Sequence, residues 1–371
     1  MHSFLGGSRS GHAPGWGIRQ KQTGADRLSL GGALAANVHG RGLALKPIVD
    51  DVESLTLVDG FGDVHECNRE QNTELFRLAV GGYGLVGVIS SVRLRLVPRR
   101  LLERVVDVTD IDELNTAFDA RVASGFMYGD FQFAIDGADP SFLRRGVLSC
   151  YRPVGQATEV PEGQRALTPD DWRKLLHLAH VDKAKAWDVY AAHYVATSGQ
   201  LYYSDAHQFS DYVDDYHRWI DDVTEAGERG TEMITEVFVP RDRLADFMSE
   251  AAEYLRGAEA DVIYGTIRLI ERDDVTFLPW ARERWACVIF NLHIVHTPLG
   301  LQRAVESFRR LIDMAIARGG SYFLTYHRWA RRDQVEACYP EFAAFLAAKR
   351  QYDPEERFQS DWYRHYQQVF G

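Results

Sequence analysis

The glycine-rich run at residues 82–87 (GYGLVG) matches the GxGxxG pattern of dinucleotide-binding turns. In a Rossmann fold this turn leaves a strand and opens a helix, so that the pyrophosphate meets the helix N-terminus. Here the order is reversed, because residues 72–80 have helical spacing and residues 88–97 alternate like a half-buried strand. The pattern therefore predicts no Rossmann site. Two interpretations stay open: a glycine turn without a ligand, and a ligand-facing wall shared with the glycine-rich residues 31–42.

The pair His293 and His296, in the sequence LHIVH, has the chemistry of metal ligands. His293 lies within an apolar run, residues 286–295, that is typical of a strand, and His296 directly follows it. Residues three apart on a strand point to opposite faces, so the two imidazoles cannot share an ion. We therefore predict a structural role for them and no metal site. The four cysteines are far apart and form no CxxC pair, which predicts reduced packing residues.

Other kinds of chemistry have weak support. The sequence has no GxSxG nucleophile elbow and no Walker A loop, the usual markers of acyl and phosphoryl transfer. Its net charge of −11 argues against a nucleic-acid partner and favours a small-molecule substrate. The 371 residues are 46% apolar, enough to bury a full core. We find no run that could span a membrane and no secretion signal, so we expect a cytoplasmic protein.

Strands and helices must position any such site. Along the chain the expected strands and helices do not alternate strictly, which predicts an α+β fold with an antiparallel sheet. Residues 1–24 are glycine-rich without apolar periodicity and predict an irregular start. The last fifty residues are rich in aromatic side chains, so this tail should dock against the body. We expect strands at 54–59, 63–67, 233–239 and 286–295, helices at 243–255 and 301–317, and a surface loop at 156–171.

Two segments resemble a known family in order, spacing and flanking strand. Residues 31–42 (GGALAANVHGRG) and 75–89 (LFRLAVGGYGLVGVI) are similar to the second half of the FAD-binding domain of the vanillyl-alcohol oxidase family, also called PCMH-type. Within it the chain is most similar to sugar and polyol oxidases: decaprenylphosphoryl-ribose oxidase, aldonolactone oxidase and alditol oxidase. Residues 339–342 and 352–361 resemble the segment that returns to the flavin. The resemblance implies an FAD-dependent oxidoreductase that oxidises a CH–OH group of a sugar, polyol or lactone by hydride transfer.

The resemblance also implies a domain plan. The family places a complete N-terminal lobe before the first motif, whereas here that motif starts at residue 31. We therefore expect an irregular N-terminus (1–25), the second lobe of the FAD domain (26–100), an α+β substrate domain (101–330) and a returning C-terminal segment (331–371). Bound FAD should be non-covalent, because the absent lobe carries the linking histidine of many relatives. The alternative is a truncated, catalytically incompetent remnant that acts only as a binding or inactive protein.

The family's cofactor contacts transfer to two groups of residues here. Glycine suits both groups because no Cβ stands between the backbone and a ligand. A turn histidine bonded to backbone is the alternative for His39. The resemblance assigns the flavin wall to Gly31, Gly32, Ala36, Asn37, His39 and Gly40, and the adenosine side to Gly82, Gly84, Val88 and Ile89.

Three further residues are implied in catalysis. The resemblance places Arg268 beside the substrate, where its permanent charge suits an alkoxide or a reduced flavin. An ion pair of Arg268 with Glu271 or Glu236 is the alternative. Tyr326 and His327 occupy the place of the relatives' lysine. Histidine titrates near pH 6.5 and tyrosine near pH 10, which favours His327 as the base and Tyr326 as a substrate contact.

Overall fold

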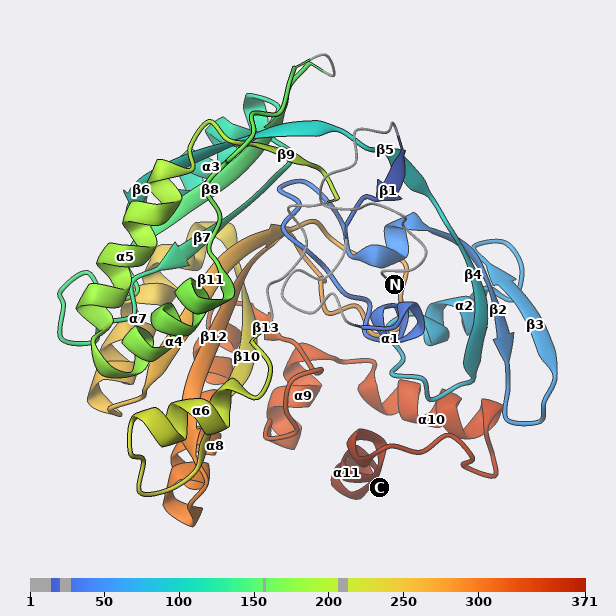
Figure 1. Ribbon diagram of the computed structural model, residues 1–371. Helices are drawn as coiled ribbons and strands as arrows, with labels where there is room; N and C mark the ends of the chain where they lie inside the picture. The colour runs from blue at the N-terminus through green and yellow to red at the C-terminus, as the bar shows by residue number, and fades with distance from the viewer. Residues whose placement is uncertain (1–14, 21–27, 156–157, 206–212) are drawn as a thin grey trace.

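A large antiparallel sheet organises the molecule in the computed structural model, which describes residues 15–20, 28–155, 158–205 and 213–371. It occupies the left half of Figure 1, and a three-stranded sheet lies on the right. The large sheet has the order β13-β10-β12-β11-β7-β8-β6-β9. Its strands are β6 (Leu101–Asp110), β7 (Tyr128–Phe133), β8 (Arg145–Pro153), β9 (Leu201–Tyr203), β10 (Gly230–Pro240), β11 (Val262–Ile270), β12 (Trp285–Val295) and β13 (Ser321–Tyr322).

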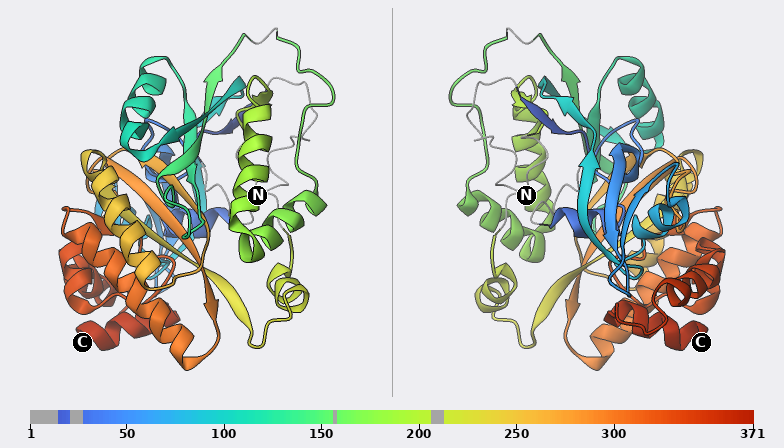
Figure 2. Two further views of the ribbon diagram at one scale, coloured as in Figure 1. Left: turned by 90° about the vertical axis from the view of Figure 1, so that its left-hand side faces the viewer. Right: turned by 90° about the vertical axis from the view of Figure 1, so that its right-hand side faces the viewer.

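Strand alternation gives this sheet two different faces. Val237 and Val288 are paired across β10 and β12 on a face that is buried under three helices. Glu236, which directly precedes Val237 in β10, points to the opposite face. Figure 2 shows the sheet between the two sets of helices. The apolar face is covered by α3 (Ile111–Ala123), α7 (Leu244–Gly257) and α8 (Pro298–Ile316), and the opposite face by α4 (Pro169–Val181), α5 (Lys183–Ala196) and α6 (Tyr216–Val223).

Local capping explains where α4 begins. In α4 the Thr168 hydroxyl accepts from the Asp171 N–H while the Asp171 carboxylate accepts from the Thr168 N–H, a reciprocal capping box. Pro169 follows at the first helical position, where its missing N–H costs nothing. Residues 158–168 contain no helix or strand, as predicted, but α4 begins within the expected loop. The predicted residues 156–157 lie outside the described part.

The first hundred residues contain the smaller sheet and two short helices. The predicted strands and helix in this region are confirmed. Residues 16–18 form a strand, which corrects the expected irregular start; residues 1–14 and 21–25 lie outside the described part. A helix over residues 30–35 was not predicted. The elements are β1 (Trp16–Ile18) paired with β5 (Leu96–Pro98), α1 (Leu30–Ala35), the 3-10 turn η1 (Ile48–Asp51), and the sheet β3-β2-β4 (Val64–Asn68, Val52–Val58, Val88–Leu94) with α2 (Thr73–Ala79).

The GxGxxG run has the context that the sequence predicted. Residues 82–87 lie between the end of α2 and the start of β4. Every strand pairing among the described residues is antiparallel. The predicted absence of a Rossmann turn at these glycines is therefore confirmed, and so is the mixed α+β character with an antiparallel sheet.

The C-terminal tail docks on the body, as its aromatic content predicted. It comprises α9 (Arg332–Cys338), α10 (Phe342–Tyr352) and α11 (Asp361–Phe370). Trp362 stacks on Tyr83 with ring centroids 4.4 Å apart, and the Tyr352 hydroxyl donates to Glu74 over 3.0 Å. Phe342 and Tyr366 are fully buried in a core that continues into both sheets. The tail therefore joins the small sheet to the large one.

Two further predictions concern the state of the cysteines and the presence of membrane-spanning helices. All four cysteines are buried and free, as predicted. Among the described residues, no helix combines the length and the apolar character that crossing a bilayer requires.

Candidate active site

A buried carboxylate and imidazole lie on the face of the large sheet opposite α3, α7 and α8, which we call the polar face. Glu236 stands in the middle of β10, and His39 follows α1. His39 Nε2 lies 2.7 Å from Glu236 Oε1, and neither side chain has any exposed surface. The His39 ring packs against Trp280, with centroids 5.0 Å apart, and against the edge of Phe323. These aromatic rings exclude water, so the pair interacts in a medium of low dielectric constant.

Proton counting shows what this pair can do. His39 Nδ1 lies 3.2 Å from the carbonyl oxygen of Gly40, which can only accept a hydrogen bond, so Nδ1 donates. The contact between Nε2 and Glu236 Oε1 then needs one further proton, on either the ring or the carboxyl. The alternative of a turn histidine bonded to backbone holds for Nδ1, but Nε2 binds a carboxylate. The pair therefore holds one proton between two groups that can each release it.

Arg268 and Tyr326 lie on the same side of the sheet. Arg268 in β11 is directly opposite Cys287 in β12, and Glu236 lies two positions further along on the same face. Burial raises the pKa of Tyr326 well above its ordinary value; the Glu236 carboxylate raises it further, and Arg268 acts in the opposite sense. Burial also raises the pKa of the Cys287 thiol. The phenol is therefore a neutral hydrogen-bond donor beside a fixed positive charge.

An ion pair with Glu271 was one alternative for Arg268, but Glu271 forms its ion pairs with two other arginines. Glu271 Oε1 lies 3.0 Å from Arg241, and its Oε2 lies 2.9 Å from Arg284. Arg268 is instead nine-tenths buried on the polar face. Its charge is directed to the groups around Tyr326 and Cys287.

His327 lies on the other face of β10. Its Nε2 is 3.1 Å from the hydroxyl of Thr235, which precedes Glu236 and so points toward α8. Its ring packs on Phe308 of α8 with centroids 4.8 Å apart. Burial lowers the pKa of His327 to about 4, which corrects the value near 6.5 expected for an unperturbed ring. The structure thus brings Arg268 and Tyr326 to Glu236 and does not bring His327 to them.

The polar face also carries buried atoms that have no hydrogen-bond partner among the described residues. Burying a polar atom without a partner costs about 1–3 kcal/mol, so each one needs a reason. The strand registers place these atoms on the same face as Arg268. They are Gln132 Oε1, Ser149 Oγ, Thr266 Oγ1 and Asn291 Oδ1. A polar ligand on this face would supply the missing partners.

The two glycine clusters meet in space. The N–H groups of Gly81 and Tyr83 donate to the carbonyl oxygens of Leu34 and Ala35 at the end of α1, both over 2.9 Å. Gly31 lies in the first turn of α1, and a Cβ built there would meet nothing within 4 Å. The two glycine clusters therefore lie side by side, and internal packing does not explain the glycine at position 31.

Other residues predicted at the cofactor have internal roles that the structure shows. Asn37 is fully buried: its amide donates to Asp273 over 2.9 Å and accepts from the N–H of Val49 over 3.1 Å. A Cβ at Gly82 would overlap the carbonyl oxygen of Leu78, so close packing explains that glycine.

Of the remaining residues predicted at the cofactor, all but Gly40 lie at or near the surface. Gly40 is buried and accepts from His39. The others are Gly32, whose N–H caps onto Ser29, Ala36 at the end of α1, the exposed Gly84 with φ +71°, and Val88 and Ile89 on β4.

Sequence reasoning missed two features of the site. Glu236 entered only as a possible ion-pair partner, yet a lone carboxylate within the apolar strand residues 233–239 was a signal of a buried charge. Trp280, which covers His39 and donates to the carbonyl oxygen of Asn37 over 2.9 Å, lies in a loop without periodicity and gave no signal. A sealed acid–base pair beside a permanent positive charge makes this region a candidate site for proton transfer.

Comparisons with known proteins agree with the glycine motifs. No family model matches this sequence. Cytokinin dehydrogenase 9 of Oryza sativa subsp. japonica is 40% identical over 86 residues, which are 23% of this chain and 16% of the relative. The mitochondrial L-galactono-1,4-lactone dehydrogenase of Arabidopsis thaliana is 36% identical over 85 residues, 23% of this chain and 14% of the relative. Over the matched segments the chain is similar to these dehydrogenases, which confirms the predicted relationship to the PCMH-type FAD-binding oxidoreductases.

The matched segments are short. Cytokinin dehydrogenase 10 of Oryza sativa subsp. japonica matches over 118 residues at 30% identity, which is 30% of this chain. The chain spans less than a quarter of the length of each of these three relatives.

Proposed function

We propose that this chain is part of an FAD-dependent oxidoreductase that oxidises a CH–OH group of a sugar, polyol or lactone. The observation that carries the proposal is the His39–Glu236 pair on the polar face, beside Arg268 and Tyr326. Alcohol oxidation releases a hydroxyl proton and a hydride, so it needs a proton acceptor and a stabilised alkoxide. The relationship to lactone dehydrogenases supports the substrate class.

Each residue of the site has a task in this proposal. Tyr326 is partly exposed, whereas Glu236 is sealed behind it, so the phenol contacts the substrate hydroxyl and passes the proton inward. The contact between His39 Nε2 and Glu236 Oε1 already contains one proton, so with that proton on His39 the second carboxylate oxygen, Glu236 Oε2, accepts the proton that Tyr326 passes on. Arg268 stabilises the developing negative charge. We therefore assign the base to Glu236 with His39 in place of His327, whose ring faces α8.

The described residues fit a flavin on two counts. Gly31 leaves open space beside the joined glycine clusters, and the polar face presents buried atoms that need partners. When bound, FAD would supply the hydride acceptor. The backbone of α1 and of residues 81–84 would hold it, and Arg268 would carry positive charge toward it.

The first experiment tests whether the chain takes up FAD. The purified chain, and the same chain extended by whatever its gene encodes upstream, are mixed with FAD and desalted. A retained flavin spectrum supports the proposal, and a colourless protein in both cases supports the binding or inactive alternative. Acid precipitation then checks the linkage, because we expect the flavin to leave the pellet.

The second experiment tests the substrate class. Anaerobic stopped-flow flavin reduction is measured with aldonolactones, polyols and, since relatives include cytokinin dehydrogenases, a cytokinin. Reduction by a lactone or polyol alone supports the proposal. Reduction by the cytokinin alone would overturn the CH–OH assignment while keeping the oxidoreductase.

A further inference from the structure

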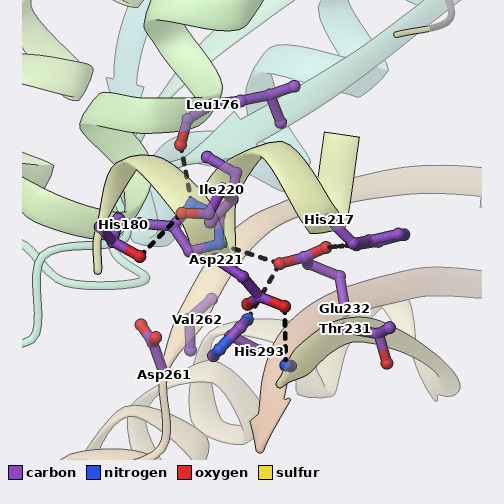
Figure 3. A network of polar contacts seen from close by, with 12 residues as sticks. Leu176, His180, His217, Ile220, Asp221, Thr231, Glu232, Asp261, Val262 and His293 are labelled. Atoms are coloured by element: carbon purple, nitrogen blue, oxygen red, sulfur yellow. Dashed lines mark hydrogen bonds and ion pairs between the residues drawn. The ribbon is translucent and has the colours of Figure 1, made fainter. Parts of the chain in front are cut away.

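A second histidine–carboxylate group lies at the start of β10, at the rim of the same polar face (Figure 3). Its centre is Glu232, a buried side chain. Glu232 Oε1 lies 2.9 Å from His180 Nε2 and 3.0 Å from His293 Nδ1, so one oxygen stands between two imidazoles. Glu232 Oε2 lies 2.5 Å from His217 Nδ1, which makes no hydrogen bond to any residue that the structure describes. Three imidazole nitrogens thus surround one carboxylate.

Four separate elements bring these groups together. Glu232 and His293 are direct partners in the register of β10 and β12, which puts both side chains on one face. His180 comes from the last turn of α4, and His217 from the first turn of α6. A Cβ at Gly230 would overlap the His293 ring, so the glycine allows this ring to lie over the strand. The cluster is therefore built into the packing of α4 and α6 on the sheet.

The orientation of His180 is that of a metal ligand. His180 Nδ1 lies 2.8 Å from the carbonyl oxygen of Leu176, which can only accept, so Nδ1 donates and Nε2 is left to carry either a second proton or a metal ion toward Glu232. A backbone carbonyl that holds the second ring nitrogen in this way is the usual support of a metal-binding histidine. Nε2 then faces the lone pairs of Glu232 Oε1, and a neutral imidazole would be repelled there. A cation between the two removes the repulsion.

We propose that His180, His293 and Glu232 bind one zinc ion that ties α4 to the sheet, with the fourth position open to solvent beside His217. Imidazole with a carboxylate suits zinc, whereas calcium and magnesium take oxygen ligands. Tetrahedral ligands at the usual zinc distances stand roughly 3.4 Å apart. The observed separations of 2.9 and 3.0 Å are about 0.4–0.5 Å shorter than this, whereas the 2.5 Å between His217 Nδ1 and Glu232 Oε2 is too short for two ligands of one ion. The site is independent of the proposed redox function.

The other metal-type group, formed by His39, Glu236 and Cys287, is a poorer site. All three side chains are fully buried, which leaves no entry path for an ion. Burial raises the pKa of the Cys287 thiol well above its ordinary value, so the thiolate that zinc needs is disfavoured. At the rim cluster, His217 keeps about a third of its side chain exposed, which provides access.

The competing state of the rim cluster is a set of ion pairs held by protons. Burial alone would raise the pKa of the Glu232 carboxyl, but hydrogen bonds from His180 and His293 lower it far below its ordinary value. Protonated imidazoles would hold the same geometry without metal. Zinc must displace these protons, so metal binding and the proton-held state are alternatives that an experiment separates.

The test measures zinc affinity in the full chain without a histidine tag. The protein is stripped with a chelator and titrated with Zn²⁺ against a chromophoric competitor. We expect one zinc per chain, and a loss of affinity of about 100-fold or more in His180→Ala and in His293→Ala, because each removes a ligand. The matched control is His296→Ala: this histidine is three residues from His293 and bonds to Thr231 instead, so its loss should leave the affinity unchanged.

Two further readouts keep the proposal falsifiable if a core variant unfolds. His217→Asn changes the partly exposed imidazole that contacts Glu232 from the start of α6, and it should weaken zinc binding about tenfold or more with the fold intact. Added Zn²⁺ should raise the melting temperature of the parent and of His296→Ala, but not that of His293→Ala, since a ligand that binds the native state stabilises it. Less than one zinc per chain, or equal affinity in parent, His217→Asn and His293→Ala, would overturn the site.

Discussion

Strand β10 carries two histidine–carboxylate groups on one face, four residues apart, and they differ in what surrounds them. Glu236 meets one imidazole, that of His39, behind a wall of aromatic rings. Glu232 meets three imidazoles at the rim of the sheet. One imidazole with one sealed carboxylate can share a proton, whereas several imidazoles around a carboxylate form a metal donor set. The number of donors and their access to solvent distinguish the two chemistries, because the residue types are the same.

Charge separates the two groups further. Arg268 and Tyr326 accompany Glu236, so a negative charge that develops there meets a guanidinium. Near the rim group, Lys183 is bound by Asp261 over 2.5 Å. The Glu236 group is therefore equipped to stabilise a reacting anion, and the rim group to hold a cation.

The largest expected effect is that of Glu236→Gln. Glutamine keeps the size and a hydrogen bond to His39 but cannot take a proton, and loss of a general base typically costs 10²–10⁴ in rate. Flavin reduction by substrate, measured in the FAD-loaded protein by stopped flow, should fall by that order with the flavin content unchanged. Glu232→Gln should change zinc content and slow reduction by at most a few fold. Equal losses in the two variants would contradict the distinction between the groups.

The second effect concerns His327, on the opposite face of the same strand. Its pKa is about 4 in the folded protein and near 6.5 in an unfolded chain, so between these values the unfolded state binds more protons. Stability should therefore fall as pH drops from about 6.5 toward 4, by about 3 kcal/mol in total. Urea unfolding of the parent and of His327→Gln at a series of pH values measures this, and the variant should show a flatter profile.

The same variant tests the base assignment. We expect His327→Gln to slow flavin reduction less than tenfold, because its ring faces Thr235 and Phe308. A loss of 10²–10⁴ would restore His327 as the base. If the stability of the parent and that of His327→Gln depend on pH in the same way, the His327 ring is not buried as a neutral group.

A smaller effect is expected for Arg268→Lys. Lysine keeps the charge but replaces a planar fork with a flexible ammonium, so we expect flavin reduction to slow about tenfold. Arg284→Lys is the control, because Arg284 pairs with Glu271 at an exposed position. If Arg268→Lys reduces its flavin at the parental rate, only the positive charge matters at this position, and the planar shape of the guanidinium does not.

The smallest effect is expected at the glycine wall, which adjoins the Glu236 group alone. Gly31→Ala adds a Cβ into open space within α1 and should stabilise the protein without FAD by about 0.5–1 kcal/mol. The same Cβ should weaken FAD retention if the flavin approaches there. Gly257→Ala at the end of α7, where nothing lies within 4 Å either, should leave FAD retention unchanged. Undiminished FAD uptake by Gly31→Ala would remove Gly31 from the cofactor wall.

Local pattern was enough to predict most of the elements. The apolar alternation of residues 286–295 and the helical spacing of 301–317 correspond to β12 and α8, because burial of one face is a local requirement on the sequence. The order of helix, glycines and strand around residues 82–87 excluded a Rossmann turn. α1 was missed because Gly31 and Gly32 disfavour a helix, and hydrogen bonds from residues 81 and 83 hold its last turn.

The amino-acid sequence by itself determined the periodicity of the strands and helices, the glycine motifs and the opposite directions of His293 and His296, which do bind different partners. Only the tertiary structure decided which side chains meet. His180 and Glu232 are 52 positions apart, and His39 and Glu236 are 197 apart. Their contacts depend on strand register and on which helix covers which face of the sheet. These choices are made by packing over the whole core, and no local pattern encodes them.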